Sequence, residues 1–222
     1  MNRTGVPFRE VSLVCLAVGV TATSYGATAT ASGFPWWVPV VLAVTVLAGS
    51  AEFLFVGIVA AGGGPIAAAV AGLLVNARHL AYGLSIADVV GTGWRRLLGS
   101  HVMNDESVVL ALARPDPAAR RVAYWASGLG VLVCWPAGAA LGAVAGSAVP
   151  DTAAIGLDAM FPAILLALVL PALREARVAR AAVAGAVIAV ATTPFLPAGL
   201  PVLLALLALP LALPPRTAGG DR

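Results

Sequence analysis

Long apolar runs fill this chain from end to end, and proline and glycine mark the breaks between them. Only 10% of the 222 residues are charged and 60% are hydrophobic, whereas a soluble domain is typically about a quarter charged. A spanning helix needs about 20 apolar residues, and the strands of a membrane barrel would alternate in polarity. The sequence therefore predicts an all-α, polytopic membrane helix bundle. The runs cover about residues 12–32, 36–61, 65–87, 97–113, 122–148, 152–171, 178–193 and 199–213.

This composition excludes a water-soluble fold, a disordered chain and a nucleic-acid-binding protein. All thirteen basic residues are arginine, and the net charge of +3 indicates orientation in a membrane, because positive residues collect on cytoplasmic loops. Cys15 and Cys134 lie inside apolar runs and are interpreted as packing residues. We expect the first run to be a retained helix rather than a signal peptide, and residues 1–222 to form a single transmembrane domain.

Two arrangements of the runs are open. If all eight cross with the N-terminus inside, ten of the thirteen arginines are cytoplasmic, but Arg95 and Arg96 lie outside, against the positive-inside rule. If 65–87 and 97–113 instead enter from the cytoplasm and return, six helices span and both of these arginines become cytoplasmic. Either way, we expect six to eight hydrophobic segments with the N- and C-termini in the cytoplasm.

Two regions favour helices that do not run straight through the bilayer. The run 97–113 is short and carries Asn104, Asp105 and Glu106, which indicates a broken, re-entrant element or a crossing buried in protein. The last two runs are also short and are separated by glycine and by several prolines that begin at Pro194. That pattern is typical of half-helices lining a transporter site, and a tilted hairpin in a thinned bilayer explains it equally well.

Polar side chains inside these runs are the candidate functional groups, because a charge at mid-bilayer costs roughly 2.5–3.5 kcal/mol and usually faces a cavity or a partner. Glu52 is either a proton-titrating or ammonium-binding carboxylate or a protonated, hydrogen-bonded group. Arg78 needs a counter-ion, which Glu52, Asp105 or a substrate carboxylate supplies; a purely structural pair is the alternative. Asn76 and His79 lie beside Arg78, and His79 is either a proton relay or a packing residue.

The remaining candidates are three acids. Asp105 and Glu106 are adjacent and point about 100° apart on a helix, so we expect only one to face a cavity; alternatively both lie at the cytoplasmic surface near Arg114. His101 and Asp105 have the i, i+4 spacing of two metal ligands, but no third ligand follows at a telling distance, so we predict no metal site. Asp158 opens a later run as a helix cap or as an ion-coupling group.

Enzyme motifs are absent from the sequence. It contains no Gly-x-Ser-x-Gly elbow, no His-Glu-x-x-His pair and no phosphate-binding glycine loop. We therefore expect a protein that is not an enzyme and needs no cofactor. An intramembrane hydrolase built from His101, Asp105 and Ser107 is the alternative.

Four blocks of the sequence resemble the AzlC/BrnF family, the large subunits of branched-chain amino acid exporters. The blocks are residues 48–53, 76–85, 104–107 and 156–161, and their order and spacing fit over nearly the whole chain. The resemblance implies efflux of leucine, isoleucine, valine and related amino acids, driven by the proton motive force, in the bacterial inner membrane. It also implies a small AzlD/BrnE-like membrane subunit as partner.

The residues and the resemblance together give one hypothesis. A zwitterionic amino acid places its carboxylate against Arg78 or a half-helix N-terminus, its ammonium group against Glu52 or Asp105, and its side chain among small apolar residues. Many relatives carry glutamine at the position of Glu52, which favours Asp105, Glu106 or Asp158 as the proton-coupling acid. The alternative is a non-transporting membrane scaffold or assembly subunit whose partner carries the pathway.

Overall fold

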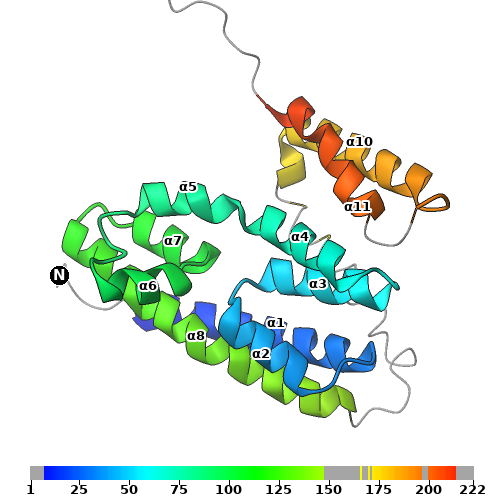
Figure 1. Ribbon diagram of the computed structural model, residues 1–222. Helices are drawn as coiled ribbons and strands as arrows, with labels where there is room; N and C mark the ends of the chain where they lie inside the picture. The colour runs from blue at the N-terminus through cyan, green and yellow to red at the C-terminus, as the bar shows by residue number, and fades with distance from the viewer. Residues whose placement is uncertain (1–7, 148–165, 167–169, 171, 197–199, 214–222) are drawn as a thin grey trace, which may run out of the picture.

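The computed structural model is helical throughout the part of the chain that it describes, which is residues 8–147, 166, 170, 172–196 and 200–213. No β-strand occurs in these ranges, which confirms the predicted all-α class. Figure 1 shows α1 to α8 as one bundle, with α10 and α11 beside it. In chain order the helices are α1 (Phe8–Ala31), α2 (Trp37–Thr45), α3 (Gly49–Ala60), α4 (Pro65–Asn76), α5 (Arg78–Ser85), α6 (Trp94–His101), α7 (Asp105–Leu112), α8 (Pro117–Ser147), η1 (Ala172–Arg174), α10 (Ala176–Thr192), α11 (Leu200–Ala205) and η2 (Leu206–Ala212).

Three helical stretches are long and apolar enough to cross a membrane: α1, α4 with α5 (Pro65–Ser85), and α8. At 1.5 Å per residue, the 31 residues of α8 extend about 46 Å, more than the roughly 30 Å of a bilayer's hydrocarbon core. Large apolar side chains on these helices, such as Leu13, Val133 and Leu141, are exposed. In a bilayer they face lipid, which explains why so apolar a chain leaves them uncovered.

Helices α1 and α8 lie side by side along most of their length (Figure 1). Gly138, Gly142 and Gly146 repeat every four residues on the face of α8 that touches α1. A Cβ atom at Gly142 would overlap the backbone carbonyl oxygen of Thr23. Close approach through small residues is typical of membrane helix pairs, because without a hydrophobic drive they associate by van der Waals packing.

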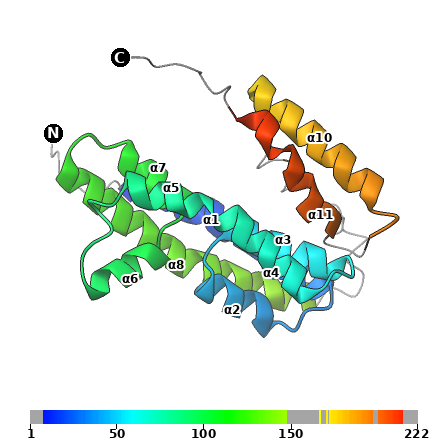
Figure 2. The same ribbon diagram turned by 45° about the horizontal axis from the view of Figure 1, so that its top comes forward.

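The apolar runs 36–61 and 97–113 each form two short helices that double back (Figures 1 and 2). Residues 46–48 separate α2 from α3, and residues 102–104 separate α6 from α7. In the first of these turns Leu47 has a φ of 51°, a left-handed conformation that non-glycine residues rarely adopt. The predicted break in 97–113 is confirmed, whereas the expectation of one helix over 36–61 is wrong.

Ion pairs define one end of this bundle, which we call the basic end. Arg114, which follows α7, pairs with Glu10 at the start of α1. Arg120, at the start of α8, pairs with Asp88 in the loop after α5, 3.5 Å away. The same end carries every other arginine of residues 8–147 except one inside the bundle; these are Arg9, Arg95, Arg96 and Arg121.

The two hairpins enter the bundle from opposite ends. The α6–α7 hairpin begins and finishes at the basic end, and its turn packs against Gly128 near the middle of α8. The α2–α3 hairpin begins and finishes at the other end, where Phe34 contacts Phe55. Between them, His101 Nε2 donates a hydrogen bond to the carbonyl oxygen of Val44, 2.9 Å away. The two turns therefore face each other within the bundle.

This arrangement revises the predicted topology. The stretch Pro65–Ser85 runs from one end of the bundle to the basic end, so the alternative in which run 65–87 returns does not fit, and neither does the alternative in which all eight runs extend straight through. Run 36–61 returns instead. Arg95 and Arg96 still share an end with Arg114 and Arg120, as the positive-inside rule requires. The return of run 36–61 has the same effect on their position as the predicted return of run 65–87.

Two short helical segments close the described chain. Helix α10 packs against α11 and η2 as a hairpin, and α11 lies between α10 and α4 (Figure 2). Leu203 of α11 packs on a small apolar cluster between α3 and α4 that contains Ile58, Ala68 and Ala71. The predicted pair of short segments is confirmed as helical, and its role at a transport site stays a prediction.

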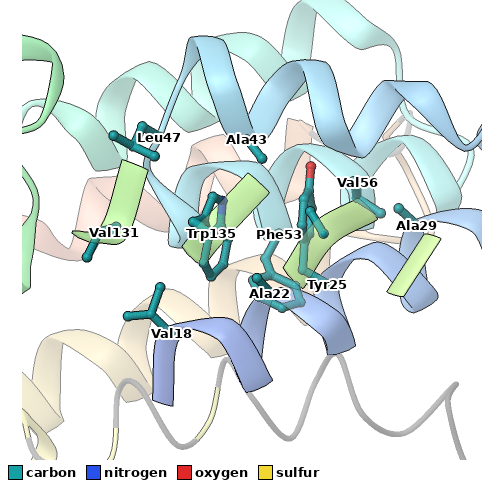
Figure 3. Packing of buried hydrophobic residues seen from close by; sticks show 11 residues of the cluster. Val18, Ala22, Tyr25, Ala29, Ala43, Leu47, Phe53, Val56, Val131 and Trp135 are labelled. Atoms are coloured by element: carbon teal, nitrogen blue, oxygen red, sulfur yellow. The ribbon is translucent and has the colours of Figure 1, made fainter. Parts of the chain in front are cut away.

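An aromatic cluster forms the core where α1, α3 and α8 meet (Figure 3). Tyr25, Phe53 and Trp135 are each at most 5% exposed. The ring of Tyr25 lies edge-on to Phe53, with centroids 5.2 Å apart, and is stacked on Trp135 at 5.7 Å. Paired aromatic rings contribute more than their buried area alone, so this core holds α3 firmly against α1 and α8.

Candidate functional site

Three helix breaks meet inside the bundle and enclose a pocket of about 100 Å³. The α2–α3 turn contributes residues 47–50, and the α6–α7 turn contributes residues 104–106. Arg78 and His79 come from the junction of α4 and α5. One side of the pocket is thus polar, and apolar residues of α1, α3 and α8 form the other side; these are Val18, Phe53, Val131 and Trp135.

Arg78 is the cation of the pocket. One terminal nitrogen, Nη2, donates to Ser50 Oγ at 2.8 Å and lies 3.0 Å from Asp105 Oδ2. The predicted need for a counter-ion is therefore met by Asp105, not by Glu52. Within the described part of the chain, the buried Nε of Arg78 has no hydrogen-bond partner, so the guanidinium retains a donor that nothing there uses.

Asp105 accepts a second hydrogen bond on its other oxygen. Tyr82, one helical turn after Arg78, donates its hydroxyl to Asp105 Oδ1 at 2.6 Å. The carboxylate is 48% exposed and the Arg78 side chain 30% exposed. Both groups therefore face the pocket rather than a packed interior, which leaves them accessible to a ligand.

Glu106 also lines the pocket, so the expectation that only one of the adjacent acids faces a cavity is wrong. Both residues lie in the first turn of α7, and that end of the helix points at the pocket. A helix that meets a cavity end-on presents its whole first turn, whatever the angle between successive side chains. The alternative position near Arg114 is wrong for the same reason.

Two helix N-termini point toward this pocket. Helix α7 is capped by Asn104, whose Oδ1 accepts from the Ser107 backbone N–H at 2.8 Å, while Ser107 Oγ accepts from the Asn104 N–H at 3.0 Å. Helix α3 begins at Gly49, beside the pocket-lining Ala48. Helix N-termini carry partial positive charge and favour anions, so they add to the field of the arginine.

Glu52 lies behind the pocket wall and does not line it. Its side chain is buried, with 1% of the residue exposed. Oε1 accepts from the Ala48 backbone N–H at 2.9 Å, and Oε2 accepts from Trp135 Nε1–H at 3.0 Å. Both oxygens thus already have donors, and the carboxylate ties the α2–α3 turn to α8.

A second cavity of about 190 Å³ adjoins the pocket through Ala48 and His79. Asn76 and His101 also line it. His79 Nδ1 lies 3.0 Å from the Asn76 carbonyl oxygen, and the side-chain oxygen of Asn76 is buried without a partner in the described chain. His79 therefore separates the two spaces, in a position compatible with the predicted proton relay.

His101 and Asp105 are four residues apart in the sequence but do not lie on one helix. Residues 102–104 interrupt the helix between them, and His101 instead bonds to α2. Asp158 lies outside the described residues, so its role stays a prediction.

Sequence reasoning missed Ser50, Tyr82 and Trp135. Tyr82 had a usable signal, because it lies four residues after Arg78 and residues with that spacing share one face of a helix. Ser50 is two residues from Glu52 and offered no signal beyond its polarity. Trp135 lies in the middle of α8 among apolar neighbours, where only the fold reveals what its indole N–H contacts.

Comparisons with known proteins agree on one family. The profile of the AzlC family, described as AzlC protein, matches residues 13–149. The branched-chain amino acid transport protein AzlC of Bacillus subtilis (strain 168) is 32% identical over 146 residues, which cover 64% of this chain and 57% of that protein. The chain thus spans less than two thirds of this relative's length, and no solved structure matches it. Because the family match covers more than half of the chain and every residue of the pocket, the chain belongs to the AzlC family.

Proposed function

We propose that this chain exports branched-chain amino acids and related apolar ones, driven by the proton motive force. The observation that carries the proposal is the pocket between the hairpin turns, where Arg78, two acids and two helix N-termini form one side and apolar side chains form the other. Substrate sites of transporters are typically built at discontinuous helices near the bilayer midplane. The name of the Bacillus subtilis relative, a branched-chain amino acid transport protein, supports the same cargo.

The pocket suits a zwitterion with an aliphatic side chain. The substrate carboxylate binds the Arg78 guanidinium, which has an unused Nε–H, and the N-terminal turn of α3 or α7. The ammonium group binds Asp105 or Glu106, because the oxygens of Glu52 already have donors. The aliphatic group packs against Leu47 and its apolar neighbours.

Proton coupling follows from competition at one carboxylate. The substrate ammonium group and a proton both bind Asp105, and each excludes the other. When a proton from outside neutralises Asp105, the ammonium group loses its partner and the substrate departs; when that proton leaves to the cytoplasm, the restored carboxylate binds the next substrate. Opposite movement of the two hairpins exposes the pocket to each side in turn, since each hairpin reaches it from a different end.

The basic end faces the cytoplasm in this proposal, because arginines collect on the inner side of a membrane. The N-terminus is then cytoplasmic, the α2–α3 hairpin enters from outside, and the chain is a multi-pass protein of the bacterial inner membrane. A small AzlD/BrnE-like subunit works with it in the membrane, as the family resemblance implies.

Cysteine labelling tests this orientation. In a variant without Cys15 and Cys134, a cysteine at Ser32 or at Ala61 is expected to react with a membrane-impermeant maleimide on intact cells, and one at Thr92 to be protected. All three positions are exposed, and both ends of the α2–α3 hairpin lie on one side. Labelling of Ser32→Cys and Thr92→Cys with protection of Ala61→Cys contradicts the hairpin and supports eight crossings.

A transport assay tests the function itself. In inside-out membrane vesicles that contain the chain and its small partner, an acidic lumen is expected to drive accumulation of labelled leucine. A protonophore should abolish this accumulation, because the gradient is its only energy source. Vesicles with the partner alone are the control: equal accumulation there makes the chain a scaffold, and no accumulation with both subunits contradicts the proposal.

A further inference from the structure

The indole ring of Trp135 forms one wall of the pocket, and the neighbouring residues hold this ring in one orientation. The residue is 5% exposed and lines the pocket. Its ring is stacked on Tyr25, with an interplanar angle of 17°, and lies edge-on to Phe53 with centroids 6.4 Å apart. Figure 3 shows the indole between these aromatic side chains and the group formed by Val18, Leu47 and Val131. The ring thus separates the fixed core from the open pocket.

The nitrogen edge of the indole is held by the buried carboxylate of Glu52. The indole Nε1 donates to this carboxylate and lies 3.0 Å from Oε2 and 3.2 Å from Oε1. Because the same carboxylate also accepts from Ala48 N–H, it fixes the ring and the α2–α3 turn relative to each other. Rotation of the ring away from Glu52 would leave a buried N–H donor without an acceptor, so this rotation is disfavoured.

The benzene edge of the indole packs against Gly49, which has no side chain. A Cβ atom at Gly49 would lie 2.7 Å from Cη2 of Trp135, which is closer than two carbon atoms approach. The ring therefore packs directly against the first residue of α3. Neither edge of the indole leaves room for the ring to turn when a larger ligand enters.

We propose that Trp135 sets the largest apolar side chain that the pocket accepts, and that Glu52 is the positioning residue that keeps it there. This inference rests on the proposed transport function, because the selected group is the side chain of the transported amino acid. A wall that can shift discriminates poorly between sizes, whereas a fixed wall excludes side chains that reach it. Glu52 thus acts on selectivity through Trp135, without contact with the substrate.

Substrate selectivity in reconstituted vesicles tests the proposal. The readout is exchange of labelled leucine, and the ratio of the half-inhibiting concentrations of valine and phenylalanine measures size preference. Trp135→Phe removes part of the ring and the N–H donor, so inhibition by phenylalanine relative to valine should strengthen about 10-fold, since each methylene in an apolar pocket contributes roughly 10–200-fold. Trp125→Phe is the matched control, because Trp125 lies on the same helix and donates to Val89 outside the pocket.

Two Glu52 variants separate positioning from charge. Glu52→Ala leaves the Trp135 N–H without its acceptor, so the ratio should shift in the same direction as in Trp135→Phe. Glu52→Gln keeps one acceptor oxygen and should preserve a ratio close to that of the unaltered chain. Stabilisation of the purified variants by leucine, measured as a rise in thermal midpoint, shows that each still folds and binds.

The outcomes separate this inference from the proposed function. If the unaltered chain exchanges leucine and the ratio is the same in Trp135→Phe and Glu52→Ala, the inference fails alone. If Glu52→Gln shifts the ratio as much as Glu52→Ala does, Glu52 acts through its charge and its positioning role is wrong. If the unaltered chain neither binds nor exchanges any amino acid, the proposed function fails and the inference with it.

Discussion

Replacing Arg78 by glutamine is expected to lower leucine transport about 100-fold while changing stability little. Loss of one partner of a hydrogen-bonded charge pair at a binding site costs roughly 2–5 kcal/mol, and each 1.4 kcal/mol corresponds to about tenfold in affinity. For folding, the pair with Asp105 contributes less, because its side chains are 30% and 48% exposed and exposed ion pairs contribute about 0–1 kcal/mol. The measurement is the initial rate of leucine accumulation in inside-out vesicles, with the thermal midpoint of the same protein.

Arg114→Gln is the matched control for this change. It removes the same guanidinium from an ion pair with Glu10, but at the basic end and away from the pocket. Transport within about twofold of the unaltered rate is expected there. Equal losses in Arg114→Gln and Arg78→Gln would mean that net charge or insertion limits transport, and would contradict a substrate contact at Arg78.

A paired variant distinguishes a structural ion pair from a substrate contact. Arg78→Gln with Asp105→Asn replaces both charges by neutral polar groups. If the pair only stabilises the fold, the double variant recovers exchange of leucine for leucine, because no unpaired charge remains. If Arg78 binds the substrate carboxylate, the double variant lacks this exchange although its thermal midpoint is normal, and that is the expected result. Asp105→Asn alone should still exchange leucine for leucine but lose the response to the proton gradient.

The class of fold and most polar positions of the site were predictable from the sequence. Charge is so scarce that each acid or arginine inside an apolar run requires a partner, and this reasoning identified Arg78 and Asp105 as a possible pair. The break in run 97–113 was also predictable, because the run is short and carries Asn104, Asp105 and Glu106. Local sequence carried enough information in these cases.

The turn at 46–48 was not predictable, because its causes are distant in the sequence. Its residues, Val46, Leu47 and Ala48, are all apolar and resemble the interior of a spanning helix. The turn is held by Glu52, which bonds to Trp135, 83 residues further along the chain. A left-handed residue such as Leu47 costs energy, and only these tertiary contacts offset it.

The two hairpins, which enter from opposite ends, explain why Arg95 and Arg96 lie at the same end of the bundle as the other loop arginines. A chain with all runs crossing puts Arg95 and Arg96 on the wrong side, and the sequence offered a return of run 65–87 as a remedy. The structure brings these arginines to the basic end by folding 36–61 back. The positive-inside rule therefore constrained the number of runs that return. Packing between distant helices decided that run 36–61 returns and run 65–87 does not.

Replacing Gly142 by alanine is expected to destabilise the whole bundle, by roughly 1–3 kcal/mol or more. The added Cβ would overlap the carbonyl oxygen of Thr23 and would lie 2.9 Å from the backbone nitrogen of Ala27. These atoms belong to the backbone of α1, which cannot move aside as a flexible side chain does, so α1 and α8 must separate. The measurement is thermal unfolding of the purified protein in detergent.

Gly19→Ala is the control at the same helix interface. Its Cβ would meet nothing nearer than the Cys134 carbonyl oxygen at 4.0 Å, and alanine favours a helix by about 1 kcal/mol over glycine, so its midpoint should stay or rise. Transport should fall with stability in Gly142→Ala, because both hairpin turns rest on α8, one against Gly128 and the other against Trp135. A normal midpoint in Gly142→Ala would show that α1 and α8 are further apart than described.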